Sequence, residues 1–443
     1  MSHAEKLQRL AEQIRANSGS APVGLAKDTS NLFRDRKDTP KHKLDVRAFD
    51  EVLEINVAER WVEVEGMTPY VKLVDAMLEQ GVMPAVVPQL KSITIGGAAA
   101  GVGIEASSFR YGLVHETLQE MEILLPDGEV VRATPDNEHR DLFLGFPNSY
   151  GTLGYALKLK ALAVPVKPYV ELRHARFATP EKFFAALEAA CAGDADFVDG
   201  VVFGPNELVL SEARFADAAP YASDYTYKHI YYRSLRERDS DFLTTRDYIW
   251  RWDTDWFWCS KNLGAQNFFI RRLLGPYRLN SIFYTKLMRL NSKWGLTHRL
   301  DQLLGLHRES VIQDVDIPLT NAAAFLDFFQ REIGILPIWV CPVRPYRKDA
   351  HFSLFPMRDE LYVNFGFWDV VRRRQAFAPG RHNRLVEAKV VELSGIKSLY
   401  SDSYFDEETF WRIYGGASYL ALKGKYDARG RAKNLYQKCV LRQ

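Results

Sequence analysis

Hydrophobic and polar positions along this chain alternate with two different periods, which predict a mixture of helices and strands. Within residues 3–17, Leu7, Leu10 and Ile14 follow a helical spacing, so we expect a short amphipathic helix at the N-terminus. The alternation over Trp61–Glu65 is typical of a strand with one buried face. Further elements are predicted as a helix at Tyr70–Gln80 and strands at Val52–Ile55, Ala85–Val87, Leu118–Leu125, Glu129–Ala133 and Tyr155–Val164.

The segment Pro165–Pro168 is predicted to separate two parts of the chain. A chain of 443 residues is too long for a single hydrophobic core. We therefore expect a first domain over residues 1–168 and a second over residues 169–443, with the α+β class for the whole. In the second part, strands are predicted at Val170–Phe177, Asp199–Phe203, Val311–Ile317, Ile338–Val343 and Leu361–Phe367, and helices at Thr179–Cys191, Phe325–Ile333 and Arg384–Leu393.

The overall composition, with 47% hydrophobic and 26% charged residues, is that of an ordinary globular protein. A net charge of +2 does not suggest a nucleic-acid binder. The four cysteines are scattered and form no CxxC pair, so we expect free thiols and no zinc site. The charged N-terminus lacks the apolar core of a signal peptide, and no run of about 18 apolar residues occurs. These features predict a cytoplasmic protein, with or without contact to a membrane surface.

Residues 250–300 combine aromatic and basic side chains and contain no acidic residue between Lys261 and Arg299. Aromatic rings beside cations suit the interface of a membrane, where the rings lie at headgroup depth. An equal alternative is an aromatic core segment of the second domain with a solvated basic edge. Single-stranded nucleic acid is a third interpretation, but nothing else in the chain supports it, so no nucleic acid is expected.

The segment Thr94–Gly112 is the most informative in the chain. Four glycines and three alanines lie between Thr94 and Gly103, which lets backbone N–H groups approach a ligand closely. Successive exposed N–H groups form a concavity that suits a pyrophosphate. No Gly-Lys-Ser/Thr follows, which excludes a Walker loop, and the segment lacks the crossover and acidic residue of a Rossmann fingerprint. A plain structural turn is the alternative.

Two further segments accompany it, because Lys27–Arg34 precedes the glycine-rich stretch and Tyr150–Gly154 follows it. In this order they resemble the FAD-binding domain of the vanillyl-alcohol-oxidase-type flavoproteins, the PCMH-type fold, and more narrowly its delta-24 sterol reductase branch. The resemblance covers nearly the whole chain and is carried by Val87–Gly112, Asn148–Tyr155, Lys167–Val170, Leu336–Pro342 and Lys397–Asp402. It implies a PCMH-type FAD-binding domain of two α/β subdomains, followed by a C-terminal α+β substrate domain.

Within that branch, Lys27–Arg34 and Phe109–Leu113 are similar to bacterial flavoproteins that act on methyl-branched fatty acyl chains, on the routes to tuberculostearic acid or furan fatty acids. The likeness implies that FAD is bound by Lys27, Ser30 and Asn31 in a first loop, by Thr94, Gly96, Gly97, Gly101, Gly103, Ile104, Ser107 and Ser108 in a second, and by Gly151, Thr152 and Gly154 nearer the flavin ring or the ribityl chain. Covalent relatives carry a histidine in the first loop, and none is present here, so non-covalent FAD is expected.

Three residues are candidates for catalysis, which needs an acid or a base beside the flavin. Glu105 lies inside the glycine-rich segment, where a carboxylate is unusual; an Arg-paired or solvated carboxylate is the alternative. Tyr400 and Tyr404 lie in the matched C-terminal segment, and strand alternation would place them on one face. Packing of strand aromatics is the alternative for both.

The resemblance therefore implies an FAD-dependent oxidoreductase that desaturates or reduces a carbon–carbon bond in a methyl-branched fatty acyl chain of membrane phospholipid. Desaturation is the expected direction, with the protein peripheral to the inner face of the membrane through residues 250–300. The alternatives are a sterol side-chain reductase, another FAD-linked oxidase or dehydrogenase with a soluble substrate, and a non-catalytic flavin-fold protein. A reductase would need an electron donor such as NADPH, for which no separate motif occurs.

Overall fold

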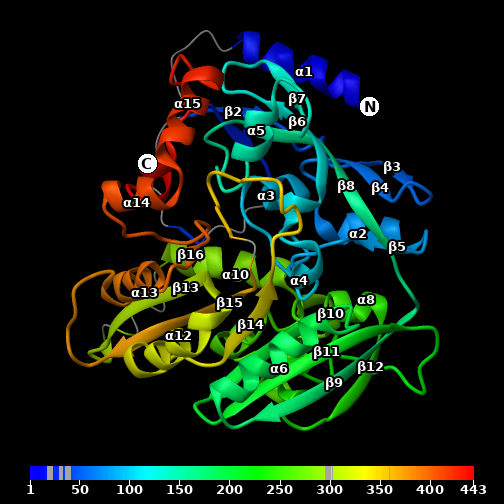
Figure 1. Cartoon of the computed structure of the whole chain (residues 1–443), viewed down its shortest axis with the longest axis vertical. Coiled ribbons are helices and arrows are strands. Elements are labelled where there is room, and N and C mark those ends of the chain that lie inside the picture. Colours follow the sequence, from blue (N-terminus) through cyan, green and yellow to red (C-terminus); the bar gives the residue numbers. More distant parts are fainter. Residues whose placement is uncertain (17–22, 29–32, 35–40, 295–300, 302, 359) are drawn as a thin grey trace.

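The computed structural model describes residues 1–16, 23–28, 33–34, 41–294, 301, 303–358 and 360–443. Two antiparallel sheets dominate the described chain: a six-stranded sheet formed before residue 168, and an eight-stranded sheet formed after it. Figure 1 shows the first in the upper half of the molecule and the second in the lower half, with helices packed on their faces. This arrangement confirms the α+β class.

The first sheet is built around one long strand, β8, which pairs with three neighbours. Its order is β3-β4-β8-β6-β7, and β5 pairs with the end of β8. The strands are β3 (Val52–Asn56), β4 (Trp61–Glu65), β5 (Val82–Pro84), β6 (Leu118–Leu124), β7 (Val130–Ala133) and β8 (Tyr155–Pro165). The accompanying helices are α1 (His3–Ala16), α2 (Tyr70–Leu78), α3 (Ile95–Ala100), α4 (Ser108–Tyr111), η1 (Val114–Thr117) and α5 (Arg140–Gly145), and a separate parallel pair joins β1 (Val23–Ala26) to β2 (His42–Asp45).

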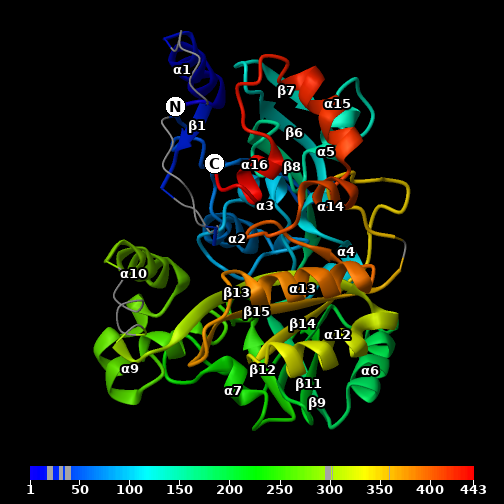
Figure 2. The ribbon, with the colours of Figure 1, turned by 90° about the vertical axis from the view of Figure 1, so that its left-hand side faces the viewer.

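The second sheet has the order β12-β9-β11-β10-β14-β15-β13-β16. Its strands are β9 (Tyr169–Phe177), β10 (Phe197–Gly204), β11 (Glu207–Ala216), β12 (Ser240–Thr244), β13 (His307–Pro318), β14 (Ile338–Val343), β15 (Tyr362–Arg373) and β16 (Ile396–Lys397). One face is covered by α6 (Pro180–Ala192), α12 (Leu319–Glu332) and α13 (Arg381–Glu392), as Figure 2 shows. Because side chains alternate across β13, Val311 and Val315 pack under these helices. Asp314 and Asp316 therefore point to the opposite face.

The aromatic segment after β12 divides into a buried and an exposed portion. Trp250, Trp252, Trp256 and Trp258 are buried and belong to the main hydrophobic core. Phe268 and Phe269, ten residues further on, are exposed. The elements here are α7 (Tyr231–Ser234), α8 (Thr245–Ile249), η2 (Cys259–Leu263), α9 (Phe268–Leu274), η3 (Pro276–Arg278) and α10 (Ser281–Trp294). The core interpretation is therefore confirmed for the tryptophan portion, and the membrane interpretation stays a prediction for the exposed portion.

The C-terminal helices return to the first sheet instead of staying with the second. They are α14 (Glu407–Ile413), α15 (Gly416–Tyr426) and α16 (Leu435–Cys439), and both ribbon views show α15 beside α5 and β7. The Lys423 ammonium donates to the carbonyl of Thr152 at 3.2 Å, and Arg34 donates to the Cys439 sulfur. The last forty residues therefore help to build the site described below.

One predicted strand is wrong. The apolar run Ala85–Val87 is buried but not extended in a sheet, and β5 ends just before it at Pro84. The Ala85 amide still donates to Leu162 of β8, but the Ala85 carbonyl accepts from the Ser107 hydroxyl at 2.7 Å and not from a neighbouring strand. The chain that follows, including Pro88 and Gln89, lines a cavity.

Candidate functional site

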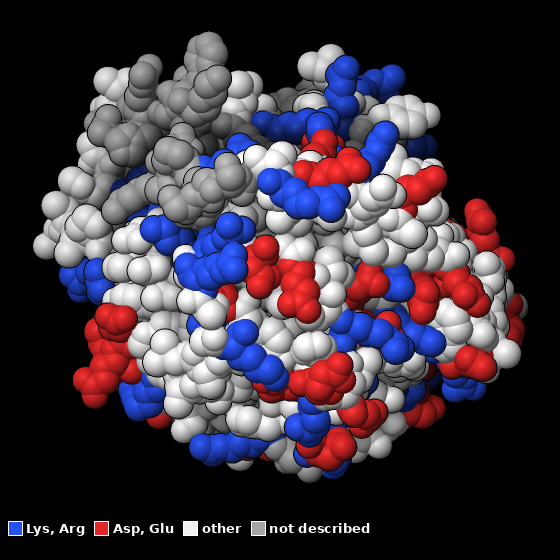
Figure 3. Space-filling view, turned by 90° about the horizontal axis from the view of Figure 1, so that it is seen from above, with Lys and Arg blue, Asp and Glu red and all other residues white. Residues whose placement is uncertain are grey.

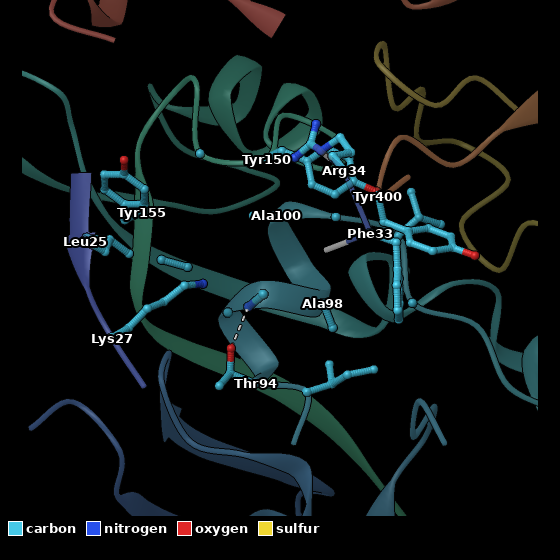
Figure 4. A pocket seen from close by; sticks show the side chains of 18 of the residues that line it. Leu25, Lys27, Phe33, Arg34, Thr94, Ala98, Ala100, Tyr150, Tyr155 and Tyr400 are labelled. Atoms are coloured by element: carbon cyan, nitrogen blue, oxygen red, sulfur yellow. Dashed lines mark hydrogen bonds between the residues drawn. The ribbon is translucent and has the colours of Figure 1, made fainter. Parts of the chain in front are cut away.

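A cavity of about 540 Å³ lies where the two sheets and the C-terminal helices meet. Its wall takes Thr94 and Gly97 from around α3, and Asp314, Trp368 and Tyr400 from the second part of the chain. Figure 4 shows Tyr400, Phe33, Arg34 and Tyr150 gathered at one end, Leu25, Lys27 and Tyr155 at the other, and α3 between the two groups. The volume is within the range of pockets for small molecules and cofactors.

The glycine-rich stretch forms the short helix α3 instead of an open loop. Thr94 caps it, and its hydroxyl oxygen accepts from the Gly97 N–H at 3.2 Å. The amides of Ile95 and Gly96 donate to the carbonyls of Thr68 and Gly66. The first amides of the helix are therefore occupied within the protein, which corrects the expectation that they face a ligand.

Two of these glycines serve the packing of the helix. A Cβ on Gly96 would lie 2.6 Å from the carbonyl oxygen of Gly66, and a Cβ on Gly103 would lie 2.7 Å from the Val114 side chain. Gly97 differs, because it is exposed on the cavity wall and a Cβ there would meet only the Thr94 hydroxyl, at 2.9 Å. Close approach to a ligand thus remains an explanation for Gly97 but not for Gly96 or Gly103.

Free backbone donors occur just beyond α3. Within the described part of the chain, the amides of Val102, Gly103 and Ile104 make no hydrogen bond, and all three residues line the cavity. This short extended segment presents N–H groups to whatever occupies the site, as the amides of a helix interior cannot. The unpaired backbone donors of the glycine-rich segment therefore lie after α3 and not within it.

Most of the residues predicted to bind the cofactor do line this cavity. They are Lys27, Thr94, Gly96, Gly97, Gly101, Gly103, Ile104, Gly151 and Thr152. Ser30 and Asn31 lie outside the described residues. Ser107, Ser108 and Gly154 do not line the cavity.

Those three residues have structural partners. The Ser107 hydroxyl donates to the carbonyl of Ala85, and the Ser108 hydroxyl accepts from the Glu105 amide at 3.1 Å. Gly154 has a φ of 138°, and a Cβ there would lie 2.6 Å from the carbonyl oxygen of Leu124. Their contact with a cofactor is therefore not supported by the geometry, and their roles lie in shaping the chain behind the wall.

Buried polar atoms in the cavity wall lack partners among the described residues. They are Nε and Nη2 of Arg34, Nε2 of Gln89, Oη of Tyr150 and Oδ1 of Asp314. A buried donor or acceptor without a partner costs about 1–3 kcal/mol, so such atoms mark places where a polar ligand is bound. An isoalloxazine ring has carbonyl oxygens and ring nitrogens along one edge, and it needs such donors and acceptors.

The charge of the wall suits an anion. The cationic side chains that line it are Lys27, Arg34, Lys41, Lys43, Lys433 and Lys438, while Asp314 is the one carboxyl group among the described lining residues. A diphosphate group needs this excess of positive charge. The set of donors, the cations and the volume together fit FAD. No histidine or cysteine is among the described lining residues.

Tyr400 occupies the cavity wall in a specific hydrogen-bonded arrangement. The indole N–H of Trp368 donates to its hydroxyl oxygen at 2.8 Å, and the Asp314 carboxyl group interacts electrostatically with the Tyr400 hydroxyl. Burial, reinforced by Asp314, raises the pKa of Tyr400 well above its usual value. Burial also raises the pKa of Asp314 to about 8, against the opposing effect of Tyr400. Both groups are therefore protonated near neutral pH.

Tyr404, predicted beside Tyr400, does not line the cavity. Its amide donates to the Glu387 carboxylate and its hydroxyl accepts from Arg442 at 3.1 Å. The segment after β16 is irregular rather than a strand, so the alternation that would have aligned the two tyrosines is absent. This placement does not support a catalytic role for Tyr404.

Glu105 is also absent from the cavity wall. Its Oε1 lies 2.8 Å from Nη2 of Arg251, and the same nitrogen lies 2.8 Å from Oδ2 of Asp199. Burial raises the pKa of Glu105 to about 7; Arg251 lowers it and Asp199 raises it. The alternative of an Arg-paired carboxylate describes Glu105 better than a catalytic role. Arg251 contacts both Glu105 in the glycine-rich segment and Asp199 on β10, and so connects that segment to the second sheet.

Sequence reasoning missed Asp314, Trp368 and the aromatic residues Trp256 and Phe257, which all line the cavity. Asp314 gave no clear signal, because its strand also carries other polar residues, among them Arg308, Glu309 and Gln313. The signal for Trp256 was hidden, because this residue is one of four tryptophans within nine residues, and all four are buried in the core.

Comparison with known proteins agrees with this geometry. Residues 2–134 match the family described as "FAD binding domain". The Delta(24)-sterol reductase of Arabidopsis thaliana is 27% identical over 446 residues, covering 91% of this chain and 77% of that protein. The human Delta(24)-sterol reductase is 28% identical over 421 residues, covering 88% and 76%. This chain is an FAD-dependent oxidoreductase.

The likeness extends in part to another enzyme. Cytokinin dehydrogenase 10 of Oryza sativa subsp. japonica is 25% identical over 188 residues, covering 41% of this chain and 32% of that protein. For this FAD-dependent oxidoreductase, the relatives that match along the greater part of the chain are sterol reductases, which favours the reductase alternative over the fatty acyl hypothesis.

Proposed function

We propose that this protein reduces a carbon–carbon double bond in an apolar lipid chain, with the side chain of a sterol as the first candidate substrate. The observation that carries the proposal is the Tyr400 hydroxyl on the cavity wall, held between Trp368 and Asp314. The names of the relatives, Delta(24)-sterol reductase, support the same reaction class.

Reduction of a C=C bond requires a hydride at one carbon and a proton at its neighbour. Bound FAD supplies two-electron chemistry, giving a hydride in its reduced form. Tyr400 then gives its phenolic proton to the adjacent carbon, so one C–H bond forms at each carbon and the π bond is lost. The raised pKa of Tyr400 keeps the group protonated, which suits a proton donor better than a base.

The residues around Tyr400 complete the proton transfer. The Trp368 N–H stabilises the phenolate oxygen that forms when the proton leaves. Asp314, protonated up to about pH 8 and electrostatically coupled to Tyr400, returns a proton to that oxygen and is itself reprotonated from solvent. The three side chains thus supply the proton, while the electrons come from a reduced nicotinamide donor such as NADPH.

Desaturation of a methyl-branched acyl chain in phospholipid is the second candidate. The exposed aromatic and basic portion of residues 268–290 favours it, because such a surface suits a substrate that resides in a bilayer. Desaturation needs Tyr400 as a base, and its raised pKa opposes that role, so reduction is placed first.

Anaerobic spectroscopy of the purified holoenzyme tests the proposal. We expect NADPH to bleach the flavin absorbance, and an unsaturated sterol side chain added afterwards to restore it as the saturated product forms. Bleaching by a saturated methyl-branched phospholipid in the absence of NADPH would support desaturation and refute the proposed direction. Acid precipitation of the same sample tests the cofactor linkage, and FAD is expected in the supernatant.

A further inference from the structure

The exposed large apolar side chains of this protein are concentrated in one region. Ten of the eighteen among the described residues lie between Phe268 and Leu304. The most exposed on α9 and η3 are Phe268, Phe269, Leu273 and Tyr277, with 69%, 77%, 81% and 93% of their surface exposed. Apolar patches on soluble proteins mark sites of interaction, and aromatic groups at this exposure are unfavourable in water.

Helical spacing orders this surface. Phe269 and Leu273 are four residues apart on α9 and lie on one face, while Phe268 lies beside Arg272 at the same spacing. Arg272 and Arg278 are exposed, and no acidic residue occurs between Lys261 and Arg299. We call Phe268, Phe269, Leu273 and Tyr277, with Arg272 and Arg278, the α9 surface.

The location of the α9 surface relates it to the cavity. Figure 2 shows α10 above α9 at the same edge of the molecule. Arg271 of α9 forms an ion pair with Asp255, the residue before Trp256, at 2.7 Å. Tyr284 of α10 is buried and stacks on Trp256, with ring planes 2° apart and centroids 6.4 Å apart. Trp256 lines the cavity, as do Val23 and Leu25 of β1. The α9 surface is therefore next to the aromatic wall of the site.

We propose that the α9 surface docks onto an anionic phospholipid bilayer, so that an apolar substrate passes from the membrane to the cavity beside α10. Apolar rings enter the headgroup region while arginines meet lipid phosphates, and the absence of carboxylates avoids repulsion from an anionic surface. Elsewhere the charges are mixed: on the face in Figure 3, Lys and Arg are interspersed with Asp and Glu. The identity of the substrate rests on the proposed function, whereas the docking to the bilayer does not.

Co-sedimentation of the full-length holoenzyme with vesicles tests this surface. We expect binding to vesicles of phosphatidylcholine with one third phosphatidylglycerol, and weaker binding to phosphatidylcholine alone. The triple variant Phe268→Ser, Phe269→Ser, Leu273→Ser should lose roughly tenfold or more in affinity. The matched control Leu53→Ser, Val57→Ser, Leu420→Ser removes exposed apolar groups elsewhere and should bind as the wild type does.

A second pair of variants tests the charges. Arg272→Glu with Arg278→Glu should weaken binding to the anionic vesicles by about tenfold or more, whereas Lys182→Glu with Arg429→Glu, two exposed cations of other elements, should not. Equal binding by wild type and both α9 variants would overturn the proposal. So would capture of a single-stranded oligonucleotide, with no vesicle binding, through the same arginines.

The measurement separates docking from catalysis. Vesicle binding is recorded without turnover, so a protein that binds vesicles but reduces no lipid would retain the docking surface and refute the proposed function. Conversely, the α9 variants should reduce a detergent-solubilised substrate at the wild-type rate while losing activity on the same substrate in vesicles. Loss of both activities with an unchanged flavin spectrum would overturn the docking proposal.

Discussion

Arg251 and Glu105 form a buried ion pair in which Nη2 lies 2.8 Å from Oε1, and Arg251 is shared with a second buried carboxylate, Asp199. Removing the cation leaves two buried carboxyl groups without it, so Arg251→Met should lower the free energy of unfolding by about 3–5 kcal/mol. Glu105→Gln keeps an acceptor for Arg251 and should cost less than about 1.5 kcal/mol. Urea unfolding of both variants at pH 7 measures the difference. Equal losses would contradict this account.

Tyr400→Phe removes the proposed proton donor but retains the ring. We expect turnover to fall roughly 100- to 10 000-fold, because that is the usual contribution of a positioned acid. Stopped-flow reduction of the flavin by NADPH should be nearly unchanged, since that half-reaction does not need the Tyr400 proton. Tyr404→Phe is the matched control, and it should retain wild-type turnover because Tyr404 does not line the cavity.

The pH dependence of turnover tests Asp314. Its pKa is raised to about 8, mainly by burial, so the proton-donating form is present below that pH and is lost as the pH rises through about 8. Wild-type turnover should therefore decline above pH 8. In Asp314→Asn the rate should be lower at all pH values and should show no decline near pH 8. An unchanged profile in the variant would exclude Asp314 from the proton pathway.

Gly96 and Gly97 are adjacent but should respond differently to alanine. A Cβ at Gly96 meets the Gly66 backbone at 2.6 Å, so Gly96→Ala should destabilise the apoprotein by about 1–3 kcal/mol. A Cβ at Gly97 meets only a hydroxyl and projects from an exposed position on the cavity wall, so Gly97→Ala should weaken FAD binding with little effect on the apoprotein. Thermal unfolding and FAD titration of the apoproteins separate the two effects.

His3 anchors α1 between two carboxylates, Glu65 and Glu122, each 2.8 Å from a ring nitrogen. Although burial alone would lower its pKa, these hydrogen bonds raise it to about 9 from the ordinary 6.5. Its contribution to stability is therefore complete below about pH 6.5 and is lost as the pH rises through 9. Hydrogen exchange of the α1 amides should accelerate over that range, and His3→Ala should exchange rapidly throughout.

The spacing of apolar residues predicted helices and strands well where that spacing is regular. The strand at Trp61–Glu65 is confirmed by β4, and the helix predicted at Tyr70–Gln80 by α2 (Tyr70–Leu78). The apolar run Ala85–Val87 misled, because burial alone does not distinguish a strand from a buried bend. The hydrogen-bond partner of the Ala85 carbonyl at that bend, the Ser107 hydroxyl, lies 22 residues later in the sequence.

The site was predictable mainly in its N-terminal half, with Tyr400 as the residue predicted from the C-terminal half that also lines the cavity. Thr94 and Gly97 lie in a motif whose composition indicates a ligand, and the structure places both on the cavity wall. Trp368 and Asp314 carry no such pattern. Asp314 lies on β13 and Trp368 on the neighbouring strand β15, and both come near Tyr400 only in the folded protein. Glu105 drew attention as an unusual carboxylate, but its partner Arg251 lies 146 residues later.

The cavity wall has a consequence for how the protein is made. Its described residues begin at Val23 and extend to Gln443, with Lys433 and Lys438 contributed by the last segment of the chain. A ribosome-bound chain that has emerged only as far as the first sheet lacks Asp314, Trp368 and Tyr400. Capture of FAD is therefore expected only after the segments that carry Tyr400 and Lys438 have been made and folded, so the cofactor does not bind to the first sheet alone during synthesis.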